Sequence, residues 1–167
     1  GFTVDYQKAF TIYLQVEQES NGYNAAQQGL GWCYQHGFGV EQNYATAKAY
    51  YTKAALQGNS LAMNRLGACY DHGLGCEQDK TKAFEWYEKS ANLGDSMAMY
   101  NLGRSYQLGY GVSQDLVKAK QWFTKTVEQG DDSLNNDGVE EHDGKTVATV
   151  DSDSSEDGDG EVDDGKE

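Results

Sequence analysis

A segment of one design occurs three times in this chain, at intervals of 36 residues. It follows the frame Leu-Gly-x-x-Tyr-x-x-Gly-x-Gly and begins at Leu30, Leu66 and Leu102. A fixed period of this length is typical of repeat proteins, in which each unit packs mainly on its neighbours. Such arrays present extended surfaces more readily than they build catalytic pockets. The period therefore predicts binding rather than catalysis.

Each period divides into two predicted helices. In the middle unit Asn59 or Ser60 caps the first helix, and Ala62, Leu66 and Tyr70 form an apolar stripe at four-residue spacing. The two glycines of the frame then end this helix, because glycine adopts the left-handed conformation that commonly follows a helix.

The second helix of each unit begins at an Asn or Asp cap. The three caps are Asn43, Asp79 and Asp115. In the middle unit the expected buried stripe is Ala83, Trp86, Tyr87, Ser90 and Ala91. The N-terminal segment 5–20 repeats the second-helix pattern, because Asp5, Ala9 and Tyr13 match Asp79, Ala83 and Tyr87 in spacing.

The sequence therefore predicts an all-α fold. We expect seven helices in an α/α superhelix, a solenoid of antiparallel helix hairpins. The array occupies residues 1–130, with a half repeat at 5–22 and full repeats at 23–58, 59–94 and 95–130.

The last part of the chain differs sharply in composition. Residues 131–167 hold 15 acidic and two basic residues, a net charge of −13, and none of the 20 aromatic residues of the chain. A segment that cannot bury apolar surface is predicted to be a disordered acidic tail. Within it Ser154, three residues before Asp157, is a candidate for phosphorylation.

Charge and hydropathy also bear on partners. Residues 1–130 carry a net charge of −1, so no basic patch indicates nucleic acid binding. No apolar run reaches the length that spans a bilayer. Three cysteines do not indicate a disulfide framework and favour a reducing compartment, the cytoplasm. A secretory or periplasmic location stays open, because the chain does not begin with Met and a fragment would have lost its signal peptide.

The repeat resembles the Sel1-like repeat family, which is related to tetratricopeptide repeats. The resemblance rests on the period, on the Gly-x-Gly turn, and on the Lys-Ala-x-x-Trp/Tyr-Tyr/Phe-x-Lys second helix, which is met most fully by residues 82–89. It covers residues 5–130. The resemblance implies an adaptor of multiprotein assemblies, because family members act in quality control at the endoplasmic reticulum, in chitin synthase activation, in signalling and in bacterial host interaction.

By similarity to tetratricopeptide packing, the first helices would line a concave groove that binds a protein or peptide segment. Trp, Tyr and Arg are frequent binding hot spots, and amide side chains can hold an extended backbone. The expected partner-binding residues are Gln28, Trp32, Gln35, His36, Asn64, Asp71, His72, Tyr100, Arg104 and Gln107. The alternative for this set is that Trp32 packs on its neighbour helix and Arg104 pairs with a carboxylate.

Other functions receive less support. The Cys-x-x-His pairs at Cys33 and Cys69 recur at the array period, but stacked repeats hold equivalent atoms too far apart for one Zn²⁺, so no metal or cofactor is expected. No nucleophile–base constellation is visible, so an enzyme is not favoured. Some cysteine-rich bacterial relatives carry a disulfide in each repeat, and the second helices here lack the cysteines for it. A hydrolase of that bacterial branch is therefore an unlikely alternative. A structural spacer within a longer array is the second hypothesis. It predicts an exposed face on the last helix, which carries Trp122 and Phe123, whereas an adaptor is expected to be a monomer.

Overall fold

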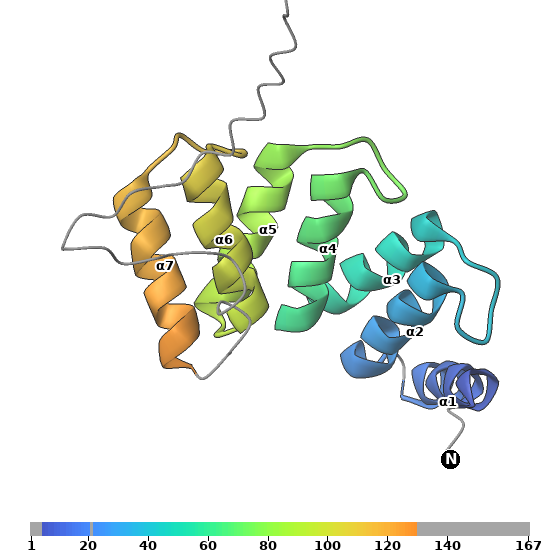
Figure 1. Ribbon diagram of the computed structural model, residues 1–167. Coiled ribbons are helices and arrows are strands. Elements are labelled where there is room, and N and C mark those ends of the chain that lie inside the picture. Colours follow the sequence, from blue (N-terminus) through green and yellow to red (C-terminus); the bar gives the residue numbers. More distant parts are fainter. Residues whose placement is uncertain (1–4, 21, 130–167) are drawn as a thin grey trace, which may run out of the picture. The chain divides into compact units, whose positions relative to one another are not determined.

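The computed structural model describes residues 5–20 and 22–129. Seven helices form this part of the chain, and they follow one another in space in their sequence order (Figure 1). The helices are α1 (Tyr6–Glu19), α2 (Asn24–His36), α3 (Tyr44–Leu56), α4 (Ser60–His72), α5 (Lys80–Asn92), α6 (Ser96–Leu108) and α7 (Leu116–Glu128). The predicted α/α array of seven helices is thereby confirmed, while the predicted tail with Ser154 lies outside the described residues.

Every helix packs chiefly on its immediate neighbours along the chain. The closest pairs are α2 with α3, α4 with α5, and α6 with α7, which are the three predicted hairpins, and α1 packs on α2. No strand occurs in the described residues, and none of their helices is long and apolar enough to cross a membrane. The fold is therefore a chain of hairpins, each covered by its neighbours.

Side-chain caps begin the second helices as the sequence predicts. Asp5, Asn43, Asp79 and Asp115 each accept a hydrogen bond from a backbone N–H in the first turn of the helix that follows. Asn59 caps α4 in the same way, so the helix begins at Ser60. Such caps satisfy donors that a helix start would otherwise leave unpaired.

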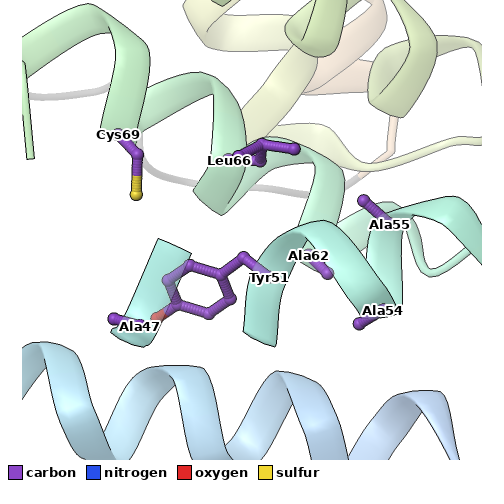
Figure 2. Close-up of a cluster of buried hydrophobic side chains, with 7 residues drawn as sticks. All are labelled: Ala47, Tyr51, Ala54, Ala55, Ala62, Leu66 and Cys69. Carbon is purple, nitrogen blue, oxygen red and sulfur yellow. The ribbon is translucent and has the colours of Figure 1, made fainter. Parts of the chain in front are cut away.

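The first glycine of the repeat frame makes room for an aromatic ring. A β-carbon on Gly31 would lie 2.6 Å from the ring of Tyr51, and Gly67 stands in the same relation to Tyr87. Tyr51 is fully buried, and in Figure 2 it lies among the small side chains of α3 and α4. The cluster consists of Ala47, Tyr51, Ala54, Ala55, Ala62, Leu66 and Cys69. Small residues thus bring two helices together around one large ring.

The last glycine of the frame joins neighbouring units. Gly75 has a φ of +69°, and a β-carbon there would overlap the backbone carbonyl of Tyr44, at the start of the preceding second helix. Gly39 meets Tyr6 and Gly111 meets Lys80 in the same manner. The loop of each hairpin therefore lies directly on the previous unit, which explains why a glycine recurs there.

One predicted core residue lies closer to solvent than expected. Ala83, Tyr87, Ser90 and Ala91 are buried in α5, but Trp86 is only half-buried. The ammonium of Lys89 stands 4.3 Å from the centre of its ring. A tryptophan at the rim of a stripe can keep one face covered by a lysine side chain, so the aromatic pattern alone overestimates its burial.

Candidate functional site

The first helices of the three hairpins, α2, α4 and α6, form one side of the array, here called the first-helix face. Amide side chains join them along the seam. Nδ2 of Asn59 donates to Oδ1 of Asn24 at 3.3 Å, and Nδ2 of Asn101 donates to Oδ1 of Asn64 at 3.0 Å. These hydrogen bonds fix neighbouring units relative to one another, so the first-helix face is held in a defined arrangement.

A pocket of about 300 Å³ opens on this face where α1, α2 and α4 meet. Its lining consists of Tyr13, Gln28, Gly29, Trp32, Leu61 and Arg65. Tyr13 lies against the backbone of Gly29, where a β-carbon would stand 2.7 Å from its ring. The lining combines two aromatic rings and a leucine with one amide and one guanidinium, and the pocket is an open depression of the surface rather than an enclosed cavity.

Arg65 is the one charged residue of the lining. Its Nε atom is buried, and no hydrogen-bond acceptor of the described residues lies within reach of it. An arginine stays protonated in proteins, so this N–H is a permanent donor on a permanent cation. A buried donor without an acceptor is unfavourable, and none of the ion pairs of the described residues involves Arg65, so its charge is not compensated by a carboxylate.

Two predicted residues, Gln28 and Trp32, are brought together at this pocket. Trp32 is half-buried, and its ring centre lies 4.6 Å from that of Phe38 and 5.3 Å from that of His36. Part of the indole therefore packs inside the protein, as the alternative interpretation supposed, while another part faces the pocket. His36 is exposed at the edge of this aromatic cluster.

Three predicted residues make internal contacts. Oε1 of Gln35 accepts a 2.7 Å hydrogen bond from the hydroxyl of Tyr51, and burial raises the pKa of that tyrosine well above its usual range. Asn64 is buried and accepts from Asn101. Asp71 is half-buried and forms a 2.6 Å ion pair with Lys80. These side chains have intramolecular partners, which a ligand would have to share or displace.

The remaining predicted residues lie further along the face. Arg104, His72 and Gln107 are exposed, and Tyr100 is half-buried with its ring 5.7 Å from that of Phe123. Among the described residues Arg104 forms no ion pair with a carboxylate. None of these four residues lines the pocket at Trp32. Their role in partner binding stays a prediction.

The cysteines behave as small core residues. Cys33 and Cys69 are buried and Cys76 is partly buried; all three are free thiols. Burial raises the pKa of the Cys69 thiol to about 11 and also raises that of Cys33. Within residues 5–20 and 22–129 no cluster of three or more His, Cys, Asp or Glu side chains could hold a metal ion.

Four of the six lining residues, Tyr13, Gly29, Leu61 and Arg65, are not among the predicted partner-binding residues. Tyr13 comes from α1. Arg65 is at the repeat position that Gly29 and Asn101 hold in the neighbouring units. The one available signal was that an arginine replaces a glycine and an asparagine at an otherwise small or amide position. That signal does not reveal that α1 closes the pocket from the other side.

The arrangement defines a class: an α/α hairpin repeat protein with an open face lined by its first helices. A family model described as Sel1 repeat matches residues 24–59, 60–95 and 96–131. These matches cover more than half of the chain, which therefore belongs to the Sel1 repeat family. The predicted units 23–58, 59–94 and 95–130 begin one residue earlier. Proteins of this family are in general protein-interaction scaffolds and mostly not enzymes.

Solved structures share the fold. The chain is 35% identical to a protective antigen of uropathogenic Escherichia coli that displays an SLR fold, with a TM-score of 0.69 over 76% of this chain and 27% of that one. It is 34% identical to a Sel1 repeat protein from Oxalobacter formigenes, with a TM-score of 0.70 over 76% of this chain and 51% of that one. The chain thus spans less than two thirds of the length of either protein.

A more distant likeness concerns the fold alone. The cysteine-rich protein B of Helicobacter pylori is 24% identical, with a TM-score of 0.60 over 79% of this chain and 95% of that one. A comparison with curated proteins gave no match.

Proposed function

We propose that this chain is an interaction scaffold that binds a segment of a protein partner in a concave groove along the first-helix face. The observation that carries the proposal is the pocket at Trp32, which combines an open aromatic surface with a buried, unpaired donor on Arg65. Large aromatic and arginine side chains contribute most to protein interfaces, because they bury large areas and form directed hydrogen bonds.

The pattern of variation along the array supports the same proposal. Core positions repeat in every unit, whereas Trp32 is replaced by Ala68 and Arg104 at the equivalent positions of the next two units. A surface that differs from unit to unit on a constant scaffold can recognise one particular segment. We place the adaptor in the cytoplasm as a monomer.

Selection of peptides from a random display library on the full chain tests this function. The selected peptides are then measured against Trp32→Ala/Arg104→Ala, with Glu85→Ala/Lys120→Ala as the matched control on exposed residues of the second helices. Peptides that bind the groove lose roughly tenfold or more in affinity with the first variant and keep it with the second.

Equal affinity for both variants would overturn the groove as the binding surface. Because Trp32 is half-buried, Arg104→Glu is measured alongside as a variant of an exposed residue. Circular dichroism and the melting temperature of each variant show that the comparison is made on folded protein.

A second candidate function is a spacer within a longer array. Trp122 and Phe123 are half-buried against α6, contrary to the expectation for an exposed end face, but α7 exposes Leu116, Val117 and Val127 by 58, 69 and 57%. Sedimentation of the chain over rising concentrations tests it. Self-association that Val117→Glu abolishes supports the spacer, and a stable monomer argues against it.

A further inference from the structure

The pocket at Trp32 contains a cation but no carboxylate. Arg65 is the one charged side chain among its lining residues, and its buried Nε–H finds no acceptor in the described part of the chain. Asp71, the acidic residue predicted for this face, is not part of the lining and is already paired with Lys80 at 2.6 Å, and it lies 3.6 Å from His72. The lining itself therefore offers Arg65 no carboxylate.

The rest of the lining is suited to an apolar side chain. The rings of Tyr13 and Trp32 and the side chain of Leu61, which is 38% exposed, line the same pocket as Arg65. A pocket of about 300 Å³ can take one large aliphatic or aromatic side chain together with a carboxylate. The charge of Arg65 favours an acidic residue and the apolar lining favours a large apolar residue. Both residues would have to lie next to each other in the bound segment.

We propose that the pocket binds an acidic residue together with an adjoining large apolar residue of an extended partner segment. The carboxylate pairs with the guanidinium of Arg65, and the apolar side chain lies against Trp32 and Leu61. A neutral carbonyl could accept a hydrogen bond from the guanidinium but would leave its charge uncompensated, whereas a charge-assisted hydrogen bond is about twice as strong as a neutral one. A phosphate would call for further donors, and besides Arg65 and the indole the lining offers only the amide of Gln28 and the hydroxyl of Tyr13.

This inference rests on the proposed function and makes it more specific. It identifies the partner by an acidic–apolar pair of residues rather than by a fold. It also assigns the specificity-determining role to Arg65, a residue that differs from its equivalents in the other two units.

The chain provides a direct spectroscopic test, because Arg65 and Arg104 are its only arginines. The arginine Nε–H region of its nitrogen–proton spectrum therefore holds two signals, which Arg65→Lys and Arg104→Lys assign. The probe is a short Gly/Ser peptide, capped at both ends, with Glu-Leu at its centre. Matched probes carry Gln-Leu or Glu-Ala instead.

We expect the Glu-Leu probe to shift the Nε–H signal of Arg65 and the indole signal of Trp32. The Gln-Leu probe binds about tenfold more weakly, because it keeps the shape and loses the charge. Arg65→Gln weakens the Glu-Leu probe by a similar factor and removes the preference for Glu over Gln. Lys120→Gln, the matched control at an exposed cation of α7 outside the first-helix face, leaves that preference unchanged.

Two results would overturn the inference: equal affinity for the Glu-Leu and Gln-Leu probes, or an Arg65 signal that no probe shifts. Failure of the proposed function looks different. In that case no library peptide loses affinity for the Trp32→Ala/Arg104→Ala variant. If only the inference fails, some peptides lose affinity for that variant but bind Arg65→Gln as tightly as the wild type. The two variants Arg65→Lys and Arg65→Gln are both checked for native helicity.

Discussion

The ring of Tyr87 in α5 lies on the backbone of Gly67 in α4, so closely that a β-carbon at Gly67 would stand 2.7 Å from two of its ring carbons. The same contact joins Gly31 to Tyr51 and Gly103 to Phe123. The second residue of the repeat frame is therefore small because each hairpin closes around an aromatic ring. This contact, rather than backbone flexibility, explains a glycine in the middle of a helix.

Gly67→Ala is expected to destabilise the protein by about 1–2 kcal/mol. Alanine normally stabilises a helix relative to glycine by about 0.5–1 kcal/mol, but the overlap with Tyr87 adds an overpacking term of about 1–3 kcal/mol. Urea unfolding monitored by circular dichroism measures the difference. In a double-mutant cycle with Tyr87→Leu the penalty shrinks, and a coupling energy near zero would show that the ring is not its cause.

Gly75 and Gly94 form a matched pair for testing contacts between repeats. Both have positive φ values, +69° and +92°, so alanine is strained at either position. A β-carbon on Gly75 would also overlap the backbone of Tyr44, whereas nothing lies within 4 Å of one on Gly94. We expect Gly75→Ala to cost about 1–3 kcal/mol more than Gly94→Ala in chemical unfolding. Equal losses would mean that only the backbone conformation matters.

The helices could be predicted because their determinants are local. The cap at Asp79 and the paired glycines after Tyr70 lie within a few residues of the boundaries they set. The end of α4 was less well defined, because the expected stripe stops at Tyr70 and the helix continues to His72. The αL conformation of Gly73 fixes that end, and its N–H bonds to the carbonyl of Cys69.

The pocket could not be predicted from the sequence, because it depends on contacts between separate helices. Position in the repeat placed Trp32 and Gln28 on the first-helix face, but the closing contribution of Tyr13 requires α1 to pack against α2. Asn64 shows the converse. Its position in the repeat placed it in the groove, yet it is buried with an internal partner, Asn101, since neighbouring first helices approach closely at that point.

Native protein is expected to react with a maleimide or iodoacetamide at Cys76 first. The thiolate is the reactive form, and burial raises the pKa of Cys69 to about 11, compared with an ordinary value of 9.0, and raises that of Cys33 as well. Cys76 is only partly buried. Mass spectrometry of peptides after brief labelling at pH 8 should show Cys76 modified about tenfold faster or more.

The control for this labelling is the unfolded chain, in which the three thiols react alike. Cys76→Ser removes the fast phase from the native protein. Faster labelling of Cys33 or Cys69 than of Cys76 would contradict the burial of these two thiols.

The last prediction concerns how the free energy of unfolding changes at acid pH because of Asp79, the N-cap of α5. The backbone N–H of Lys82 donates to Asp79 at 3.0 Å and its ammonium pairs with the carboxylate at 3.0 Å, and together they lower the pKa of Asp79 below 3.8. A lowered folded-state pKa means that the carboxylate contributes stability above pH 3.8. This contribution disappears as the pH falls through the lower folded-state value.

Asp79→Asn tests this, because asparagine keeps the capping oxygen and loses the charge. Urea unfolding from pH 7 down to about pH 2.5 gives the difference in stability between wild type and variant. We expect the wild type to be more stable at neutral pH, with the difference narrowing below about pH 4 as Asp79 becomes protonated. In a Lys82→Met background the pH dependence weakens but persists, since the backbone hydrogen bond is the larger cause of the shift. A difference that stays constant over the whole range would exclude titration of Asp79 as its origin.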